Sequence, residues 1–212
     1  MAVVGIIGQT GGGNSTKLSN MPLGMLLRVT EDSANVNYEL AGFDAYGAGT
    51  ATFVRRDIYG TSTRAEQYAE SAIDTLCNTT IFGKFSAALQ AKILEVTLTL
   101  ATSSSTSTTI DRKCFLPTFT NMGFGNNNGV TECGVLGYYS VNFYRIKKLS
   151  GTAAVWWLSS WSGAGAAKGV SSAGASVGNS ISQASGVVPA FVLSSDEQVS
   201  FPPNSDGSYN LA

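Results

Sequence analysis

The sequence contains no histidine, and only 13% of its 212 residues are charged. Histidine is the commonest general base and the commonest protein ligand for metal ions. The chain therefore lacks the usual residue of acid–base catalytic sites and of metal sites. The 13 basic and 14 acidic residues are scattered singly. Because nucleic-acid binding depends on a basic patch that neutralises phosphates, we do not expect this chain to bind nucleic acid.

Cysteines and long apolar runs are also scarce. The three cysteines, Cys77, Cys114 and Cys133, have no Cys-x-x-Cys spacing, and an odd number cannot complete a disulfide framework. We expect small buried thiols rather than a zinc site. No run reaches the ~20 apolar residues that span a bilayer, and the start lacks a signal-peptide pattern. Membrane insertion is not expected, and the expected place of synthesis is the cytoplasm.

The carboxylates form no pair with the spacing of an acid–base couple. Glu66, Glu70 and Asp74 stand four residues apart, which is typical of the solvated face of a helix. A calcium-dependent sugar site needs clustered carboxylates, and residues 156–186 contain none. We therefore expect neither an enzyme nor a bound metal or cofactor.

What the chain does contain is an aromatic strand followed by a tract of small residues. Trp156 and Trp157 are adjacent in a β-type run, so one indole lies on each face of the predicted strand. The 25 residues from Ser162 to Gly186 include 19 Ser, Gly or Ala and a single charge, Lys168. Such composition is typical of linkers, but apolar strands flank it on both sides. We interpret it as short strands and tight turns that form a display surface.

The period of the apolar residues changes along the chain and predicts an α+β fold. Apolar stripes at helical spacing predict helices over residues 68–78 and 85–96, and Thr63-x-x-Glu66 predicts a capping box before the first. Short, mostly antiparallel strands are expected around them. Residues 138–144 form an aromatic cluster that is expected to pack on the core from one side and display tyrosines on the other.

Residues 1–20 are expected to form an extended arm that precedes one domain, residues 21–212. Residues 2–7 are apolar, whereas residues 8–15 are too rich in glycine to fold alone. A disordered tail is one interpretation. The other is an assembly arm, because these few apolar side chains cannot form a core of their own and would contact another chain.

Several short motifs follow one another along the chain in a specific order: MPLG (21–24), RRDIY (55–59), YAESAIDTLCN (68–78), KCFLPT (113–118), WWLS (156–159) and GVVPAFVL (186–193). Their order and spacing resemble those of C-type-lectin-like domains of tailed-phage and gut-bacterial surface proteins. The resemblance implies two helices packed on short strands. It departs at two positions, because Ser159 and Val188 stand where the family usually has arginines that would pair. No ligand role of those arginines carries over.

These observations together predict a phage virion protein, of a tail fibre, tail tip or head fibre, that binds a host-surface glycan or protein. The predicted receptor-binding residues are Trp161 as the aromatic anchor and, around it, Lys168, Asn179, Ser180 and Gln183. Trp161 as a core residue is the alternative interpretation. Other virion proteins are the expected partners of residues 1–20, within a homo-oligomer for which a trimer is favoured. A capsid-decoration or tail component without its own ligand is the alternative function.

Overall fold

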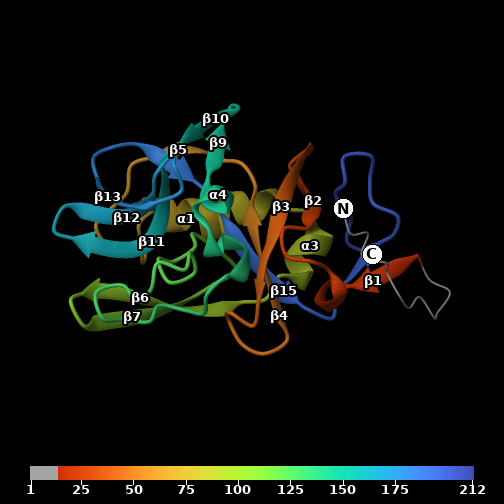
Figure 1. Ribbon diagram of the computed structural model, residues 1–212, viewed down its shortest axis with the longest axis horizontal. Helices are drawn as coiled ribbons and strands as arrows, with labels where there is room; N and C mark the ends of the chain where they lie inside the picture. Colours follow the sequence, from red (N-terminus) through yellow and green to blue (C-terminus); the bar gives the residue numbers. More distant parts are fainter. Residues whose placement is uncertain (1–13) are drawn as a thin grey trace.

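The computed structural model describes residues 14–212 of the chain, and strands dominate it (Figure 1). Over the described residues, 43% are in strands and 15% in helices. The single helix of seven or more residues in this part of the chain is the continuous run of α1 (Ala72–Thr75), the π-helical turn η2 (Leu76–Ile81) and α2 (Phe82–Lys84). The prediction of an α+β fold with two packed helices is therefore wrong, and the fold is mainly β.

One five-stranded antiparallel sheet forms the middle of the molecule. Its strands, in spatial order, are β2 (Leu26–Glu31), β3 (Ala34–Phe43), β4 (Thr50–Arg55), β15 (Ala190–Ser194) and β8 (Cys114–Phe115). The residues Ala190 to Leu193 of β15 are buried on both faces, as their unbroken apolar run predicts. Phe191 lies at the centre, with its ring 4.9 Å from that of Tyr38 and 5.5 Å from that of Phe85.

A second five-stranded sheet carries the aromatic strand. Its strands, in spatial order, are β13 (Ser176–Ser180), β12 (Ala166–Val170), β11 (Trp156–Gly163), β14 (Ser185–Val187) and β5 (Gly60–Ser62). Only β11 and β14 run parallel to each other. Trp156 and Trp157 are both fully buried, which confirms that both faces of β11 are covered. Their indole N–H groups donate to the carbonyl oxygens of Arg145 and Ser62, at 3.0 and 2.8 Å.

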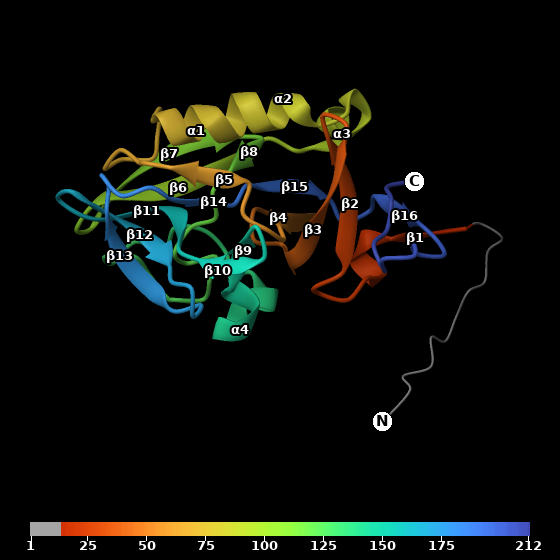
Figure 2. The ribbon, with the colours of Figure 1, turned by 90° about the horizontal axis from the view of Figure 1, so that it is seen from above.

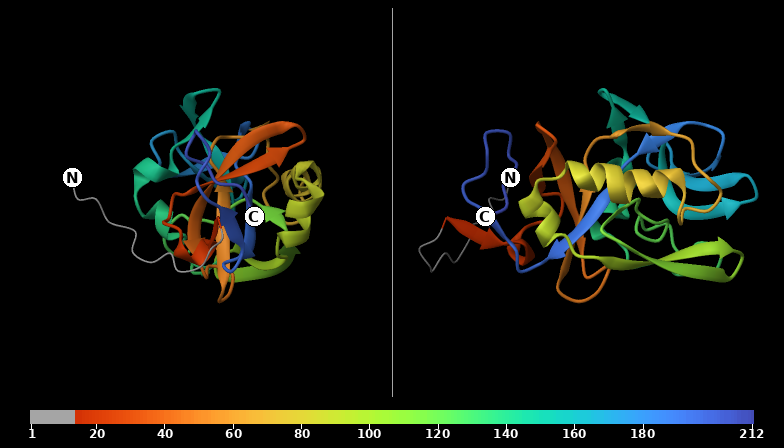
Figure 3. Two further views of the ribbon diagram at one scale, coloured as in Figure 1. Left: turned by 90° about the vertical axis from the view of Figure 1, so that its right-hand side faces the viewer. Right: turned by 180° about the vertical axis from the view of Figure 1, so that it is seen from behind.

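Three two-stranded sheets and several short helical segments complete the fold. Two of these small sheets are hairpins, β6 (Val96–Ser103) with β7 (Thr106–Arg112) and β9 (Lys147–Leu149) with β10 (Thr152–Ala154), and the third pairs β1 (Ser15–Lys17) with β16 (Gln198–Ser200) from the two ends of the chain. The short segments are η1 (Leu18–Asn20), α3 (Ala87–Lys92), η3 (Gly137–Ser140) and α4 (Asn142–Arg145). Figure 3 shows α1 and α2 lying along one long side of the molecule.

The first helix begins later than predicted, because Ser71 caps it instead of Thr63. The Ser71 side chain accepts from the backbone N–H of Asp74, and Asp74 Oδ2 accepts from the N–H of Glu70. This reciprocal cap replaces the one expected at Thr63 and Glu66, which precede the helix. Asp74 is also buried and bonded to Arg112, so the expectation of a wholly solvated acidic face is wrong.

The second predicted helix is a six-residue segment, α3, rather than a helix over residues 85–96. The Ser86 hydroxyl caps its start by accepting from the backbone N–H of Leu89. The backbone becomes extended at Ile93, and Leu94 pairs with Val192 of β15. The predicted helix therefore stops at Lys92, because the chain is extended from Ile93 and Val96 already belongs to β6.

The expected arm is shorter than residues 1–20. Ser15, Thr16 and Lys17 pair with β16, and Leu18 is fully buried in the core. Residues 15–20 therefore belong to the domain, because their backbone and apolar groups already have partners in the same chain. The rest of the predicted arm, residues 1–13, lies outside the described residues.

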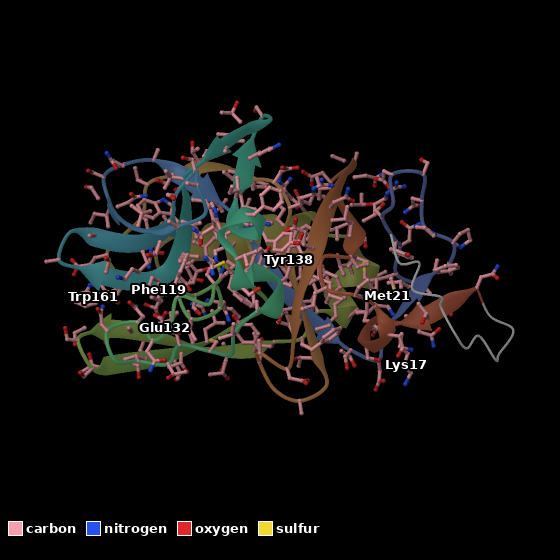
Figure 4. The ribbon with its side chains drawn as sticks, viewed as in Figure 1. Lys17, Met21, Phe119, Glu132, Tyr138 and Trp161 are labelled. Atoms are coloured by element: carbon pink, nitrogen blue, oxygen red, sulfur yellow. The ribbon has the colours of Figure 1, made fainter. Side chains whose placement is uncertain are left out.

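The molecule is elongated, with different elements at its two ends. Figures 1 and 2 show β1, β16 and the C-terminus at one end, and the hairpins β6–β7 and β12–β13 at the other. In Figure 4, Lys17 and Met21 lie at the first end and Trp161 at the second. We call these the terminal end and the hairpin end. Within residues 14–212, no helix is long and apolar enough to cross a membrane.

Candidate functional site

The predicted display surface, residues 161–183, lies at the hairpin end and is built from β11, β12, β13 and their turns (Figures 1 and 4). Positive φ angles at Gly163, Gly165 and Gly174 fall in these turns. Residues other than glycine rarely adopt such backbone angles, so the glycines are needed for the tight hairpins that the sequence predicts. The interpretation of this tract as strands and turns, rather than as a linker, is confirmed.

The five predicted binding residues do not share one face. Trp161 pairs with Ala167, and Ala167 pairs with Asn179, so Trp161 and Asn179 point to the same side of the sheet. Lys168 and Ser180 occupy alternate positions of β12 and β13 and point to the other side. The structure therefore divides the predicted site into two halves, one on each face.

Trp161 is half-buried and fixed in place. Its indole N–H donates to Glu66 Oε1 at 3.0 Å. On the other face, Lys168 Nζ lies 4.8 Å from the centre of the Phe119 ring, a distance typical of a cation–π contact. Both side chains thus contact the fold itself, and Trp161 is only in part available to a ligand.

Asn179 and Gln183 line the same shallow depression. It has a volume of about 490 Å³, and its other lining residues are Thr61, Ala154, Val155, Ala184, Ser185 and Gly186. Asn179 is half-buried and Gln183 exposed, so both amide groups can face a ligand there. The depression is the part of the predicted site that the structure brings together.

Directly beneath this surface, β11 departs from regular pairing. Trp157 pairs with Gly169 and Trp161 with Ala167, so four residues along β11 advance against two along β12. The carbonyl groups of Leu158, Ser159 and Ser160 consequently lack partners in β12. A buried carbonyl without a hydrogen bond destabilises a fold, so these groups require donors from elsewhere.

Arg64 supplies those donors. Its guanidinium donates to the carbonyl oxygens of Leu158, Ser159 and Ser160, the last at 2.9 Å. Arg64 is only 4% exposed, and this burial lowers the pKa of its guanidinium to about 10, which leaves it charged at neutral pH. It therefore fixes the irregular stretch of β11 from one side.

Glu132 holds the same stretch of β11 through a hydrogen bond from the Ser160 side chain. Its carboxylate is fully buried and accepts from the Ser160 hydroxyl, from the backbone N–H of Ala101 and from the side-chain amide of Asn127. The same Asn127 amide also donates to the carbonyl of Trp161 at 2.9 Å. Burial raises the pKa of the Glu132 carboxyl, and the hydrogen bonds from Ser160, Ala101 and Asn127 oppose that shift in part.

Two positions of the sequence, Ser159 and Val188, are an indirect sign that an arginine acts near β11. Ser159, where the resembling family usually has an arginine, is buried, and so is Val188 at the other such position. A guanidinium still contacts the Ser159 carbonyl, but it comes from Arg64, which is 95 residues earlier in the chain. Neither Arg64 nor Glu132 was among the predicted site residues.

The thiols show the character that the sequence predicts. Cys77 and Cys114 are buried and Cys133 is half-buried, and all three are free. Burial raises the pKa of the Cys77 thiol to about 12 and that of Cys133 to about 11, so neither is an activated thiolate at neutral pH. Within residues 14–212, no three His, Cys, Asp or Glu side chains are grouped to hold a metal ion.

Residues 49–195 match the model of a family described as a domain of unknown function, DUF6273. This chain belongs to the DUF6273 family. The matched DUF6273 region runs from the start of β4 to the end of β15, and so includes Arg64, Glu132 and the whole of the second sheet. No match was found among curated proteins or among solved structures.

Replacing Arg64 by methionine should destabilise the fold strongly. The three carbonyl groups of β11 would lose their donors while remaining buried, and each such group costs about 1–3 kcal/mol. We expect the free energy of unfolding in urea to fall by about 3–5 kcal/mol. Arg64→Lys, which keeps the charge but not the fork of donors, should lose less. If Arg64→Met is as stable as the exposed control Arg56→Met, Arg64 does not hold β11.

Glu132→Gln should change how stability depends on pH. The raised pKa means that the folded state holds the proton more tightly than the unfolded chain, in which a glutamate titrates near about 4.3. This contribution is complete below that pH and is lost as the pH rises through the folded pKa. We expect the unfolding free energy of the wild type, relative to Glu132→Gln, to decrease as the pH rises above about 4.3. A difference that stays flat as the pH rises would contradict the raised pKa.

Proposed function

We propose that this DUF6273 chain is a phage virion protein that binds a glycan or protein on the host surface through its hairpin end and catalyses no reaction. Residues at the terminal end attach it to the particle within a homo-oligomer, for which a trimer is favoured. The proposal keeps the function that the motif resemblance implies, without the fold that the resemblance predicted.

The observation that carries the proposal is the separation of the two ends. The start of β1 and the C-terminus lie at the terminal end, and the predicted display surface lies at the hairpin end (Figure 2). A protein attached to a particle near its termini would therefore present residues 161–183 farthest from the attachment point. This arrangement suits an adhesive role better than a role between neighbouring capsid subunits.

The chemistry of the hairpin end also supports recognition. The turns between β6 and β7 and between β11 and β12 are exposed and consist of small residues, which are Ser104, Ser105, Ala164 and Gly165. Loops of this kind can change in sequence without disturbing the sheet that carries them, as a surface that follows a changing receptor requires. The amides of Asn179 and Gln183 provide donors and acceptors for a polar ligand.

Two features support a role without catalysis. The sequence has no histidine. The buried carboxylates serve the fold: Glu31 pairs with Arg55, Asp74 with Arg112, and Glu39 Oε2 accepts from Lys147 Nζ at 2.5 Å. A carboxylate held in this way is not free to act as an acid or base.

The test is binding of labelled full-length protein to a panel of gut bacteria and to a glycan array. We expect the double variant Asn179→Ala/Gln183→Ala to bind about tenfold more weakly, because it loses two polar contacts worth about 0.5–1.5 kcal/mol each. Its melting temperature should change little, because Gln183 is exposed and the half-buried Asn179 loses only one long hydrogen bond, to Ser185 Oγ at 3.5 Å. Lys17→Ala, at the terminal end, is the matched control.

The alternative outcomes separate the two candidate functions. Binding that is equally strong in the double variant would show that the depression is not the receptor site. If the wild type binds no cell and no glycan but incorporates into particles, the chain is a decoration or tail component without its own ligand.

A further inference from the structure

A patch of exposed apolar side chains lies on the long side of the molecule, between the two ends. It consists of Leu23, Tyr138, Val141, Phe143 and Tyr144, and we call it the aromatic surface. Phe143 is 75% exposed, the most of any large apolar residue described, and Leu23, Val141 and Tyr144 are exposed as well. Figure 4 labels Tyr138 midway along the molecule, and Figure 2 shows α4 projecting on the side opposite α1 and α2.

The rings of the aromatic surface are ordered against one another. Tyr138 and Tyr144 stack with their centres 4.6 Å apart, and Phe143 stands at 73° to Tyr144. The Tyr138 ring covers Gly24, where a Cβ atom would approach it to 2.5 Å. The sequence predicted tyrosines on the outer side of this cluster, and the most exposed ring is a phenylalanine.

The fold holds α4 rigidly from several sides, although the helix is only one turn long. Arg145 Nε donates to the Tyr139 carbonyl at 2.8 Å, and its guanidinium lies 4.3 Å from the centre of the Phe124 ring. The Asn142 carbonyl packs so closely on Gly174 that no Cβ atom could be accommodated there. A rigid, exposed aromatic side chain loses little entropy on binding, so it is a typical interface anchor.

The N-terminal segment of the chain has the complementary chemistry. Residues 2–7, Ala-Val-Val-Gly-Ile-Ile, are apolar, and residues 1–16 include no charged side chain. None of the five residues of the aromatic surface is charged either. An apolar segment can therefore cover this surface without burying an unpaired charge. The mixture of aliphatic and aromatic side chains also suits a peptide better than a sugar ring.

The position of β1 favours the segment of another copy over that of the same chain. Ser15 starts β1, which lies at the terminal end, whereas α4 projects from the long side of the molecule (Figure 2). The chain before Ser15 therefore joins the domain at the terminal end and not beside its own α4. Residues 8–14 can span at most about 23–25 Å.

We propose that residues 2–7 of one copy bind the aromatic surface of a second copy. This exchange would be the contact between subunits in the proposed homo-oligomer. The subunits would form either a reciprocal pair or a closed ring. It deepens the assembly role proposed for the N-terminal segment. Its test involves no receptor and no particle, so a failure of receptor binding leaves it unaffected.

The test uses full-length chains in size-exclusion chromatography with light scattering. Phe143→Ser removes the anchor and Val4→Asp/Ile7→Asp charges the segment, so each variant should associate at least about tenfold more weakly than the oligomeric wild type. Leu94→Ser, which changes an exposed apolar residue elsewhere, should remain oligomeric. Each variant should keep the melting temperature of the isolated subunit. If Phe143→Ser does not fold, Val141→Asp replaces it.

Mixing the two defective variants distinguishes exchange from its alternatives. The Phe143→Ser chain has an intact segment and the Val4→Asp/Ile7→Asp chain has an intact surface, so an equimolar mixture should form a complex of twice the single-chain mass. A mixture that remains two monomers overturns the proposal. A monomeric wild type overturns it as well, and would mean that the surface is covered by its own chain or by a different ligand.

Discussion

The hydrogen bonds from Arg64 to three consecutive carbonyl groups of β11 are the constraint on which the rest of this structure depends. On one side of this stretch, Trp156 and Trp157 fill the core, and on the other Trp161 begins the hairpin end. The change of register between β11 and β12 would leave these carbonyls without partners. Because one buried guanidinium satisfies all three, the sheet can be irregular at the point where it emerges from the core and still be rigid.

Seven of the 27 charged residues of this chain are buried inside the fold. Lys147 is fully buried and donates both to Glu39 and to the Tyr139 hydroxyl, at 2.5 and 2.9 Å. Burial lowers the pKa of the Lys147 ammonium, while the adjacent Glu39 carboxylate opposes that shift. Such pairs are costly to break, because the remaining partner would be a buried charge. Residues 161–183 at the hairpin end include one charged side chain, that of Lys168. A surface with so little charge suits the polar, neutral ligand that we propose.

The sequence predicted the features that depend on local pattern. Adjacent tryptophans in an apolar run place one indole on each face of β11, and both are buried. The helices were misplaced because the capping box at Thr63 and Glu66 is as good a local signal as the one at Ser71. Arg64 could not be found by pattern, since the carbonyls that it bonds lie about 95 residues away. Asn179 and Ser180 were assigned to one site, although neighbours in a strand point to opposite faces.

We propose that the two ends of the molecule have different roles, attachment at the terminal end and binding at the hairpin end. A density map of a virion that contains this chain would separate these roles. We expect β1, β16 and the C-terminus against the body of the particle, with the β6–β7 and β12–β13 hairpins farthest from it and open to solvent. A map with the hairpins packed against neighbouring subunits, or with the terminal end outermost, would rule out this assignment and favour a structural component.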